Sequence, residues 1–446
     1  MKKLIVLACV MLMLFSITGC NLYGDQTGDN DIVIWASSTY WGGANETLVN
    51  EMLDKYEEEK GIKVYFVPQS DLDTKLKSVS NGAESPDIVI WDRWETVRYI
   101  QEDRFVCIDN YMQKDGIAKE LFQQEAMAEM AFGGKQYGLP LDIDAWGLWV
   151  NKTALRSVGI DKLPETWDEL RTAANALKVY SNPEQKTGMT RAGMNMKISG
   201  CFYSFLMTAG GSILNEDKTQ LTVNNEYGTA VLDFLWTLLK EDKVFDESIS
   251  ATGGGANDPF LTQSVAIQVN SLLNGSAFYN QYSDNSFEYE FIPFPKGPSS
   301  EYATESNPAG TNLGGMMGGF GLAIPVTSEK QDAAWDLISW WLADKDNAVE
   351  WSKISNLVPA LLEVMNSEEL KNVPNVRNVL KAIPYLKTRP TTLGYTSVET
   401  SVIMAKIDGL LFSNAYRGAT KYEKIAACLA DIEQSGNEVL EFYREG

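Results

Sequence analysis

Histidine is absent from the 446 residues, and this absence excludes several kinds of site. Histidine is the usual base in Ser-His-Asp and Cys-His catalysis and a frequent ligand of zinc. The sequence therefore rules out those catalytic arrangements and histidine-ligated zinc. We expect neither a metal nor a cofactor.

Cysteine is scarce, with five in the whole chain. Cys9 and Cys20 lie near the N-terminus, whereas Cys107, Cys201 and Cys428 are far apart. None of the five has the short spacing of a zinc-ligand set. We expect the last three to be buried as small apolar side chains, with one disulfide between two of them as the alternative.

Long hydrophobic runs are also missing, apart from residues 4–15. This run is shorter than the roughly 20 residues that a spanning helix needs. It follows Lys2 and Lys3 and precedes the sequence ITGC at 17–20, a pattern that resembles a bacterial lipoprotein signal. We expect residues 1–20 to be this signal, Cys20 to carry the lipid, and the polar residues 21–30 to form a tether. The mature chain would then be anchored outside the cytoplasmic membrane.

Basic residues are outnumbered, with 38 Lys and Arg against 60 Asp and Glu and a net charge of −22. Nucleic acids and anionic surfaces bind to basic patches, so the charge argues against both as partners. Hydrophobic residues make up 44% and aromatic residues 11%, as in a folded globular protein. A chain of this length exceeds one hydrophobic core, and we expect two lobes.

The first region alternates strands and helices, with strands expected at 31–36, 62–67 and 87–91. This order predicts parallel pairing through right-handed crossovers. In such open sheets, ligands bind beyond the carboxyl ends of the strands.

The loops at two of these strand ends combine aromatic and polar side chains. Aromatic rings can stack on the C–H face of a sugar, while Asp and Arg orient its hydroxyl groups. The alternatives are that Trp91 caps the core and that Asp92 and Arg93 form a surface ion pair. The candidates are Thr39, Tyr40 and Trp41 in the first loop and Trp91, Asp92 and Arg93 in the second.

Residues 137–152, YGLPLDIDAWGLWVNK, are expected to form a strand that crosses between the lobes along the floor of a cleft. Asp144 is the preferred binding candidate here, because a carboxylate on a rigid strand can accept two hydroxyl hydrogen bonds. Trp146 is a second candidate. The alternative is that Asp144 bonds to backbone at a strand end.

Later segments supply further candidates. The glycine-rich residues 310–320 predict a second crossing, and a third is expected near 357–359. A strand at 264–269 ends at Asn270, and the turn-rich residues 389–396 offer Tyr395 to the cleft. The candidates from these segments are Asn270, Phe320 and Tyr395.

The chain resembles the carbohydrate-uptake class of bacterial extracellular solute-binding proteins, the family that includes maltose-binding protein. The segments that carry the resemblance are DIVIWA at 31–36, SPDIVIWDR at 85–93, GKQYGLPLDIDAWGLWVNKTAL at 134–155, LPETWDELRTAA at 163–174 and GGFGLAIPVTSEKQDAAWDLISWWL at 318–342. The resemblance implies a two-lobed α/β fold of the type II periplasmic-binding-protein kind. Each lobe would be a mostly parallel sheet flanked by helices, with hinge crossings between them. The first lobe would comprise residues 31–143 and 322–356, and the second residues 144–321 and 357–446.

The resemblance also implies roles for single residues. Trp91 falls at the family's stacking tryptophan, and Asp144 falls where maltose-binding protein has a sugar-binding glutamate. Thr39 and Tyr40 stand in place of a charged pair, and Leu273 stands where a tryptophan is familiar.

These observations predict a receptor that binds a carbohydrate between its lobes and delivers it to an ABC-type permease. We expect it to act as a monomer and without catalysis. The same fold could instead bind a non-sugar ligand or report to a membrane sensor. A secreted glycoside hydrolase would need paired carboxylates. We expect Asp142 and Asp144 to point to opposite faces of their strand, which counts against that reading.

Overall fold

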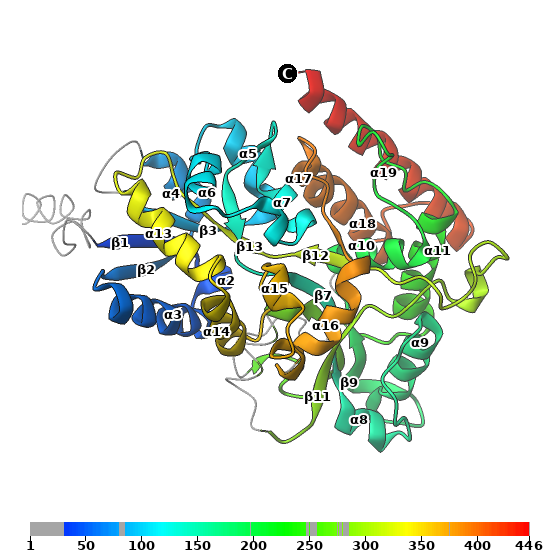
Figure 1. Ribbon diagram of the computed structural model, residues 1–446. Helices are drawn as coiled ribbons and strands as arrows, with labels where there is room; N and C mark the ends of the chain where they lie inside the picture. Colours follow the sequence, from blue (N-terminus) through cyan, green and yellow to red (C-terminus); the bar gives the residue numbers. More distant parts are fainter. Residues whose placement is uncertain are drawn as a thin grey trace, which may run out of the picture.

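The computed structural model describes residues 31–445, except 80–84, 197, 247–248, 250–256, 274, 276–278, 280–284 and 374. The expected signal, the tether and Cys20 lie outside the described residues. Figure 1 shows two α/β lobes side by side, with strands β1 to β3 in one and β7 to β11 in the other.

The first lobe is built on a five-stranded sheet with the order β2-β1-β3-β13-β6. Its strands are β1 (Ile32–Ser37), β2 (Val64–Gln69), β3 (Ile88–Asp92), β6 (Gly138–Pro140) and β13 (Phe320–Ala323). β1 pairs in parallel with β2 and β3, as the alternation of strands and helices predicts. β13 pairs antiparallel with β3 and β6, because it enters from the other lobe and runs against them.

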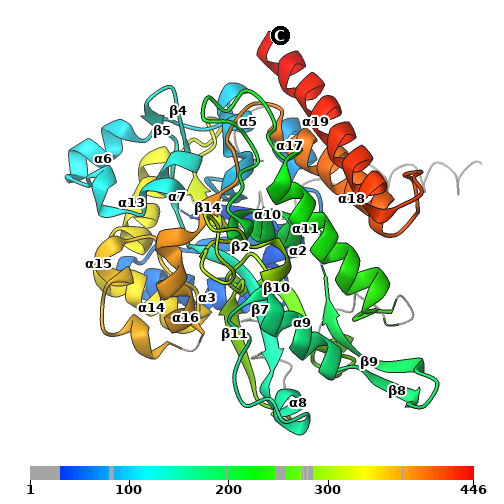
Figure 2. The ribbon, with the colours of Figure 1, turned by 90° about the vertical axis from the view of Figure 1, so that its right-hand side faces the viewer.

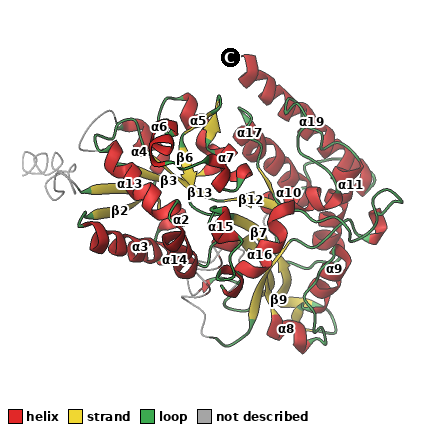
Figure 3. Ribbon diagram, in the orientation of Figure 1, coloured by secondary structure: helices red, strands yellow, loops and turns green. Residues whose placement is uncertain are grey.

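Helices cover both faces of this sheet (Figure 3). They form because apolar side chains recur at helical spacing; in α3, for example, Val49, Met52, Leu53 and Tyr56 are buried. The helices of this lobe are α2 (Ser38–Trp41), α3 (Ala44–Lys60), α4 (Leu72–Ser78), α5 (Thr96–Gln101), α6 (Asp109–Asp115), α7 (Gln124–Glu129), α13 (Gln331–Leu342) and α14 (Lys345–Ser355).

The second lobe has a larger sheet with the order β14-β12-β7-β10-β9-β8, and β11 also pairs with β7. Its strands are β7 (Asp144–Asn151), β8 (Val179–Asn182), β9 (Thr187–Asn195), β10 (Val265–Ser271), β11 (Tyr289–Pro293), β12 (Met316–Gly318) and β14 (Lys387–Thr388). The expectation of a mostly parallel sheet is wrong here. β7 pairs antiparallel with β10, β11 and β12, because this strand arrives from the first lobe.

Helices pack around this sheet and enclose a separate core (Figure 2). The capping box of Thr166 and Glu169 is confirmed at the start of α9, and Trp167 is buried behind it. The helices are α8 (Lys152–Ser157), α9 (Trp167–Ala176), α10 (Ile198–Ala209), α11 (Glu226–Trp236), α17 (Tyr395–Ser397), α18 (Ala405–Leu411) and α19 (Lys421–Glu445), with a π-helical stretch at Val398–Met404.

Three segments connect the lobes. The chain changes sheet between Pro140 and Asp144, and again between Gly318 and Phe320. The third segment pairs Val358 with Ile143 of the first, near the expected position. After it, α15 (Leu362–Met365) contacts α14, and α16 (Val376–Ala382) contacts β11, so these residues touch both lobes.

The cysteines of the folded region are free thiols. Cys201 and Cys428 are fully buried in the core of the second lobe, as expected. Cys107 is half-buried and donates a hydrogen bond to the Asp109 carboxylate. The disulfide alternative is therefore not realised in this structure.

Within the described ranges, no helix combines the length and the apolar character that crossing a membrane requires.

Candidate interlobe binding site

A cavity of about 790 Å³ lies between the two lobes. Glu125 and Glu129 of α7 line it from the first lobe, and Tyr203, Lys387 and Arg389 line it from the second. A ligand enclosed here would touch both lobes at once. Ligand sites of proteins typically have this concave form, with a few polar groups that point inward.

Arg389 places a positive charge in the wall of the cleft, although its side chain is only 11% exposed. Its Nε donates hydrogen bonds to both carboxylate oxygens of Glu399, at 2.9 and 3.1 Å. Its guanidinium lies over the ring of Trp94, 4.6 Å from the ring centre. Burial lowers the pKa of Arg389, but Glu399 and Asp92 outweigh this effect and raise it overall, so Arg389 stays charged.

Asp92 faces Arg389 from the end of β3 in the first lobe. Burial raises the pKa of Asp92 to about 7, although the nearby Arg389 opposes the rise. Among the described residues, none donates a hydrogen bond to this carboxylate, and none accepts one from the two terminal amino groups of Arg389. An acceptor and several donors are thus left for a ligand.

Tyr40 is the aromatic residue of the first predicted loop that offers a ring to solvent, with 38% of its surface exposed. The loop is itself a helical turn, closed by the hydrogen bond from Gly42 N–H to Ser38 O. Phe320 packs against the Tyr40 ring at 5.4 Å and against Trp41 at 5.1 Å. Trp41 is fully buried, so it supports this group and does not face the cleft. Thr39 is exposed beside them.

Phe320 also differs from the expectation. It is 5% exposed and lies behind Tyr40, so its role is to hold the Tyr40 ring in place. The glycines of this crossing segment also have a structural role, because they lie close to other protein groups. A Cβ on Gly319, for example, would collide with Arg93 and Asp142.

Trp91 belongs to the core, as the alternative reading held. The side chain is 4% exposed and packs edge-on against Tyr99 at 4.3 Å. Trp91 therefore offers no free face to a ligand in this structure. Trp94, in the turn that follows β3, is half-buried and lies under the guanidinium of Arg389.

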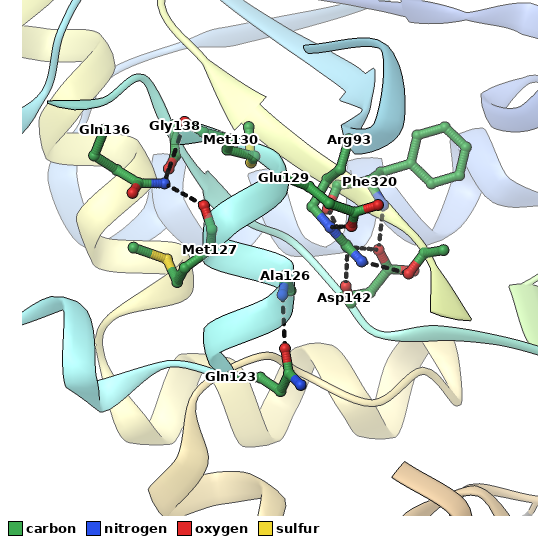
Figure 4. A network of polar contacts seen from close by, with 11 residues as sticks. Arg93, Gln123, Ala126, Met127, Glu129, Met130, Gln136, Gly138, Asp142 and Phe320 are labelled. Carbon is green, nitrogen blue, oxygen red and sulfur yellow. Dashed lines mark hydrogen bonds and ion pairs between the residues drawn. The ribbon is translucent and has the colours of Figure 1, made fainter. Parts of the chain in front are cut away.

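Arg93 is likewise not a ligand-facing residue, and it is not part of a surface ion pair. It is fully buried, and its Nε lies 2.9 Å from the Glu129 carboxylate. Its amino groups donate to the backbone carbonyls of Asp142, Gly318 and Phe320. Figure 4 shows this guanidinium between α7 and the two crossing segments. Arg93 therefore ties the hinge together.

Asp142 and Asp144 both bond to backbone in the hinge region. Phe320 N–H donates to Asp142 at 2.7 Å, and Leu273 N–H donates to Asp144 at 2.9 Å. Burial raises the pKa of both carboxyls, and for Asp142 the charge of Asp144 adds to the rise. Asp144 is 5% exposed, and these contacts agree with the structural alternative for it.

The expectation that Asp142 and Asp144 point to opposite faces of their strand is wrong. Residues two apart in a regular strand point to the same face. What separates them is that Asp142 precedes β7 and bonds to the first-lobe strand β13, whereas Asp144 bonds to a second-lobe backbone N–H.

The other second-lobe candidates differ in position. Tyr395 is 1% exposed, and burial followed by the Glu399 charge raises its pKa, so it belongs to the cluster around Arg389. Asn270 is 7% exposed on β10, and Trp146 is half-buried on β7. Neither is among the described residues that line the interlobe cavity, and neither are Tyr40, Asp92, Trp94 and Glu399, which lie around Arg389 at its edge.

The sequence-based candidates did not include Trp94, Arg389 and Glu399, although Trp94 lies in the same loop as Asp92 and Arg389 begins the segment 389–396. Arg389 and Glu399 flank the turn-rich segment that was singled out for Tyr395, so a charged residue at the start of that turn was an available signal. Trp94 lies three residues after Trp91, and its place at the carboxyl end of β3 could have been derived from the same strand.

Solved structures with the same architecture include sugar receptors and one receptor for a different ligand. An ABC transporter solute-binding protein from Thermotoga lettingae, bound with alpha-D-tagatose, matches with a TM-score of 0.75 at 18% identity over 92% of this chain and 100% of that chain. A Listeria monocytogenes ABC substrate-binding protein in complex with cycloalternan matches at 0.72 and 18% identity, over 92% and 99% of the two chains. A Mycobacterium tuberculosis protein in complex with glycerophosphocholine matches at 0.73 and 17% identity, over 93% and 99%. These likenesses confirm the type II periplasmic-binding-protein fold.

Among relatives by sequence, the maltotriose-binding protein of Pyrococcus abyssi is 22% identical over 370 residues, which cover 82% of this chain and 74% of the relative. The family model described as bacterial extracellular solute-binding protein matches residues 42–348, which is more than half of the chain. The chain belongs to the family of bacterial extracellular solute-binding proteins.

Proposed function

We propose that this protein is an extracytoplasmic receptor that binds a carbohydrate between its lobes and delivers it to an ABC-type permease. The observation that carries the proposal is that Asp92 of one lobe and Arg389 of the other lie near enough to influence each other's pKa, with Arg389 over the ring of Trp94 and both charges near Tyr40. Names of its relatives support a sugar: the Pyrococcus protein is described as binding maltotriose, and two of the solved structures hold tagatose and cycloalternan.

The chemistry of the cleft suits a sugar ring. Hydroxyl groups both donate and accept hydrogen bonds. Among the residues that the structure describes, none donates to the Asp92 carboxylate and none accepts from the terminal amino groups of Arg389, so both are available to a sugar. The exposed ring of Tyr40 offers a flat apolar face for the C–H side of a sugar. Closure of the lobes lets one ligand contact both groups, so that binding favours the closed form.

The binding residues that we propose differ from the sequence-based set. Tyr40, Asp92, Trp94, Arg389 and Glu399 form the first choice, and Tyr395 and Thr39 stand beside them. Asp144, Trp146 and Asn270 would contribute only if the lobes rearranged around a ligand. The receptor would act as a monomer and would leave its ligand chemically unchanged.

Titration of the mature chain with a panel of mono- and oligosaccharides, followed by tryptophan fluorescence, tests the proposal. A polyamine and glycerophosphocholine belong in the panel, since the same fold holds the latter in the Mycobacterium protein. We expect saturable binding of a sugar that weakens at least tenfold in Asp92→Ala. Asp54→Ala, on the exposed face of α3 and away from the cavity, is the matched control and should bind as the wild type does. Binding of only the polyamine or the phosphodiester would overturn the carbohydrate assignment.

We also propose that lipid on Cys20 anchors the receptor to the outer face of the cytoplasmic membrane. The support is the charged start, the apolar run and the ITGC sequence at 17–20. Expression of the Cys20→Ser variant in a bacterial host tests this step. The wild type should partition into detergent and incorporate labelled palmitate, whereas the variant should do neither. Equal labelling of both forms would refute the anchor.

A further inference from the structure

A second cavity, of about 540 Å³, lies in the second lobe and shares no described lining residue with the interlobe cavity. Four separate segments of the chain form its walls: the loop before α9, the end of β11 with the loop that follows it, residues 313–314, and α16. Cavities of this size are typical of sites for small molecules. The sugar site proposed above does not use this cavity.

The floor of the second cavity is apolar. Three prolines, whose φ angles are fixed, line it together with Phe294 and Leu313. Phe294 is buried against Phe205, with 5.1 Å between the ring centres, whereas 38% of the Leu313 surface is exposed. An apolar ligand that covered this surface would remove it from water, which is favourable. The prolines are Pro164, Pro293 and Pro295.

Hydrogen bonds hold the walls of the second cavity together. Trp167 N–H donates to Lys296 O at 3.1 Å, and Lys296 N–H donates to Glu165 O at 2.8 Å, so the first two segments are paired. The Asn378 amide donates to Phe291 O at 3.0 Å, which fixes α16 to β11 (Figure 1). The cavity is therefore preformed by the fold.

The two glutamates of the lining are already paired. Glu165 lies 3.8 Å from Lys296, and Glu290 lies 2.9 Å from Lys152, which is outside the lining. Asn378 donates a further hydrogen bond to Glu290 at 2.8 Å. Their negative charges are thus compensated by groups of the protein.

Two lysines of the lining keep an uncompensated charge. Lys162 and Lys381 are exposed, and neither forms an ion pair with another residue that the structure describes. Lysine has three N–H donors and no acceptor, so both offer hydrogen bonds to an anion. The whole chain has a net charge of −22, so a lining with more lysines than glutamates departs from the general charge of the protein. This charge, beside an apolar floor, is complementary to an anion with an apolar body.

We propose that this cavity of the second lobe is a second binding site, which takes a small organic anion with an apolar body and one carboxylate. The apolar body covers the proline-lined floor, and the carboxylate lies at the rim that carries Lys162 and Lys381. The site does not depend on the proposed sugar function, because the two cavities are lined by different residues.

Calorimetric titration of the mature chain with three probes of the same shape tests the proposal. The probes are phenylbutanoate, its amide and phenylbutylamine, which present an anion, a neutral group and a cation on one apolar body. We expect the anion to bind saturably and about fivefold more tightly than the amide, as one ion pair at an exposed site allows. The amine should bind more weakly than the amide.

Substitutions in the lining separate the charge from the apolar surface. Lys162→Gln and Lys381→Gln should each weaken binding of the anion by about 2-fold to about 5-fold and leave the amide unchanged. Leu313→Ser removes exposed apolar surface and should weaken the anion and the amide alike, by about 2-fold to about 10-fold. Lys114→Gln removes an exposed lysine of α6 in the first lobe and is the matched control.

All four substituted side chains are exposed, so the variants should fold, and circular dichroism checks each one. Equal affinity for the anion and the amide, or equal weakening by Lys114→Gln, would overturn the proposal. Loss of the anion in Arg389→Gln would also overturn it, because the anion would then bind in the interlobe cavity. No saturable binding of the anion would overturn it too and would favour a segment of a partner protein as the occupant. A failure to bind any sugar would leave all of these results unaffected.

Discussion

The carboxylate of Asp142 accepts a hydrogen bond from the backbone N–H of Phe320 at 2.7 Å, which ties the first crossing segment to the second. The Arg93 guanidinium bonds to carbonyls of the same two segments and to Glu129 of α7. All three side chains are almost completely buried. The hinge is therefore held by a charged network in the interior, where each missing partner leaves another group unpaired (Figure 4).

Arg93→Ala should be strongly destabilising. It removes the cation that faces Glu129 and Asp142 and leaves both carboxyls buried without it. Breaking a buried ion pair in this way costs about 3 to 5 kcal/mol of the free energy of unfolding. Urea denaturation followed by circular dichroism measures it. Arg156→Ala, which breaks an exposed pair with Glu288, should change the same quantity by less than about 1 kcal/mol.

Gly319→Ala should destabilise the hinge for two reasons that a control can separate. Gly319 has φ +130°, and a Cβ there would meet Arg93 and Asp142. Gly159→Ala introduces the same residue at φ +79° with open space around it, so it reports backbone strain alone. We expect Gly319→Ala to lose about 1 to 3 kcal/mol more of the unfolding free energy than Gly159→Ala does, as in other overpacked sites. Equal losses in the two variants would show that Arg93 and Asp142 shift enough to accommodate the extra methyl group.

Asp142→Asn should change how stability depends on pH. Burial, then the charge of Asp144, raises the pKa of Asp142 above its ordinary 3.8, so the folded state keeps its proton to higher pH than the unfolded state. Stability from this group is complete below the ordinary pKa and is lost as pH rises toward the raised one. Burial also raises the pKa of Glu129 to about 6, with the same sign.

Urea denaturation at a series of pH values from 4 to 8 measures this dependence. The free energy of unfolding should fall with pH in the wild type, and the fall should be shallower in Asp142→Asn by up to about 1.4 kcal/mol per pH unit. Asp217→Asn, at an exposed position, should keep the wild-type slope. An unchanged slope in Asp142→Asn would mean that this carboxyl does not hold its proton in the folded state.

Local pattern in the sequence was sufficient for the first lobe's strands, the capping box at Thr166 and the positions of the crossings. It was insufficient for the second-lobe sheet, because the direction of β7 is set by its origin in the other lobe. The contacts in the cleft were harder to predict than the second-lobe sheet. Arg389 meets Trp94 across almost 300 residues of chain, at 4.6 Å, and no local spacing encodes that contact. Arg93 looked like a surface residue because its partners, Glu129 and three carbonyls, come from three other segments.

Trp91 and Trp94 should differ in opposite ways in their effects on stability and on ligand binding. Trp91→Ala removes a ring that is 4% exposed and packed against Tyr99, and it should cost about 3 to 5 kcal/mol of unfolding free energy. Trp94→Ala removes a half-buried ring at the cleft and should cost about 1 kcal/mol or less, in the range of surface changes. Ligand affinity should respond in the opposite order.

Parallel measurements of unfolding in urea and of sugar affinity on both variants decide between the two tryptophans. At a temperature where both variants are folded, Trp94→Ala should weaken binding by about 2-fold to about 13-fold, the value of one aromatic contact. Trp91→Ala should bind within about twofold of the wild type, because its ring lies behind β3 and away from the cleft. If Trp91→Ala instead lost binding while remaining stable, the core would have to open to admit the ligand. The resemblance to the family's stacking tryptophan would then identify the right residue.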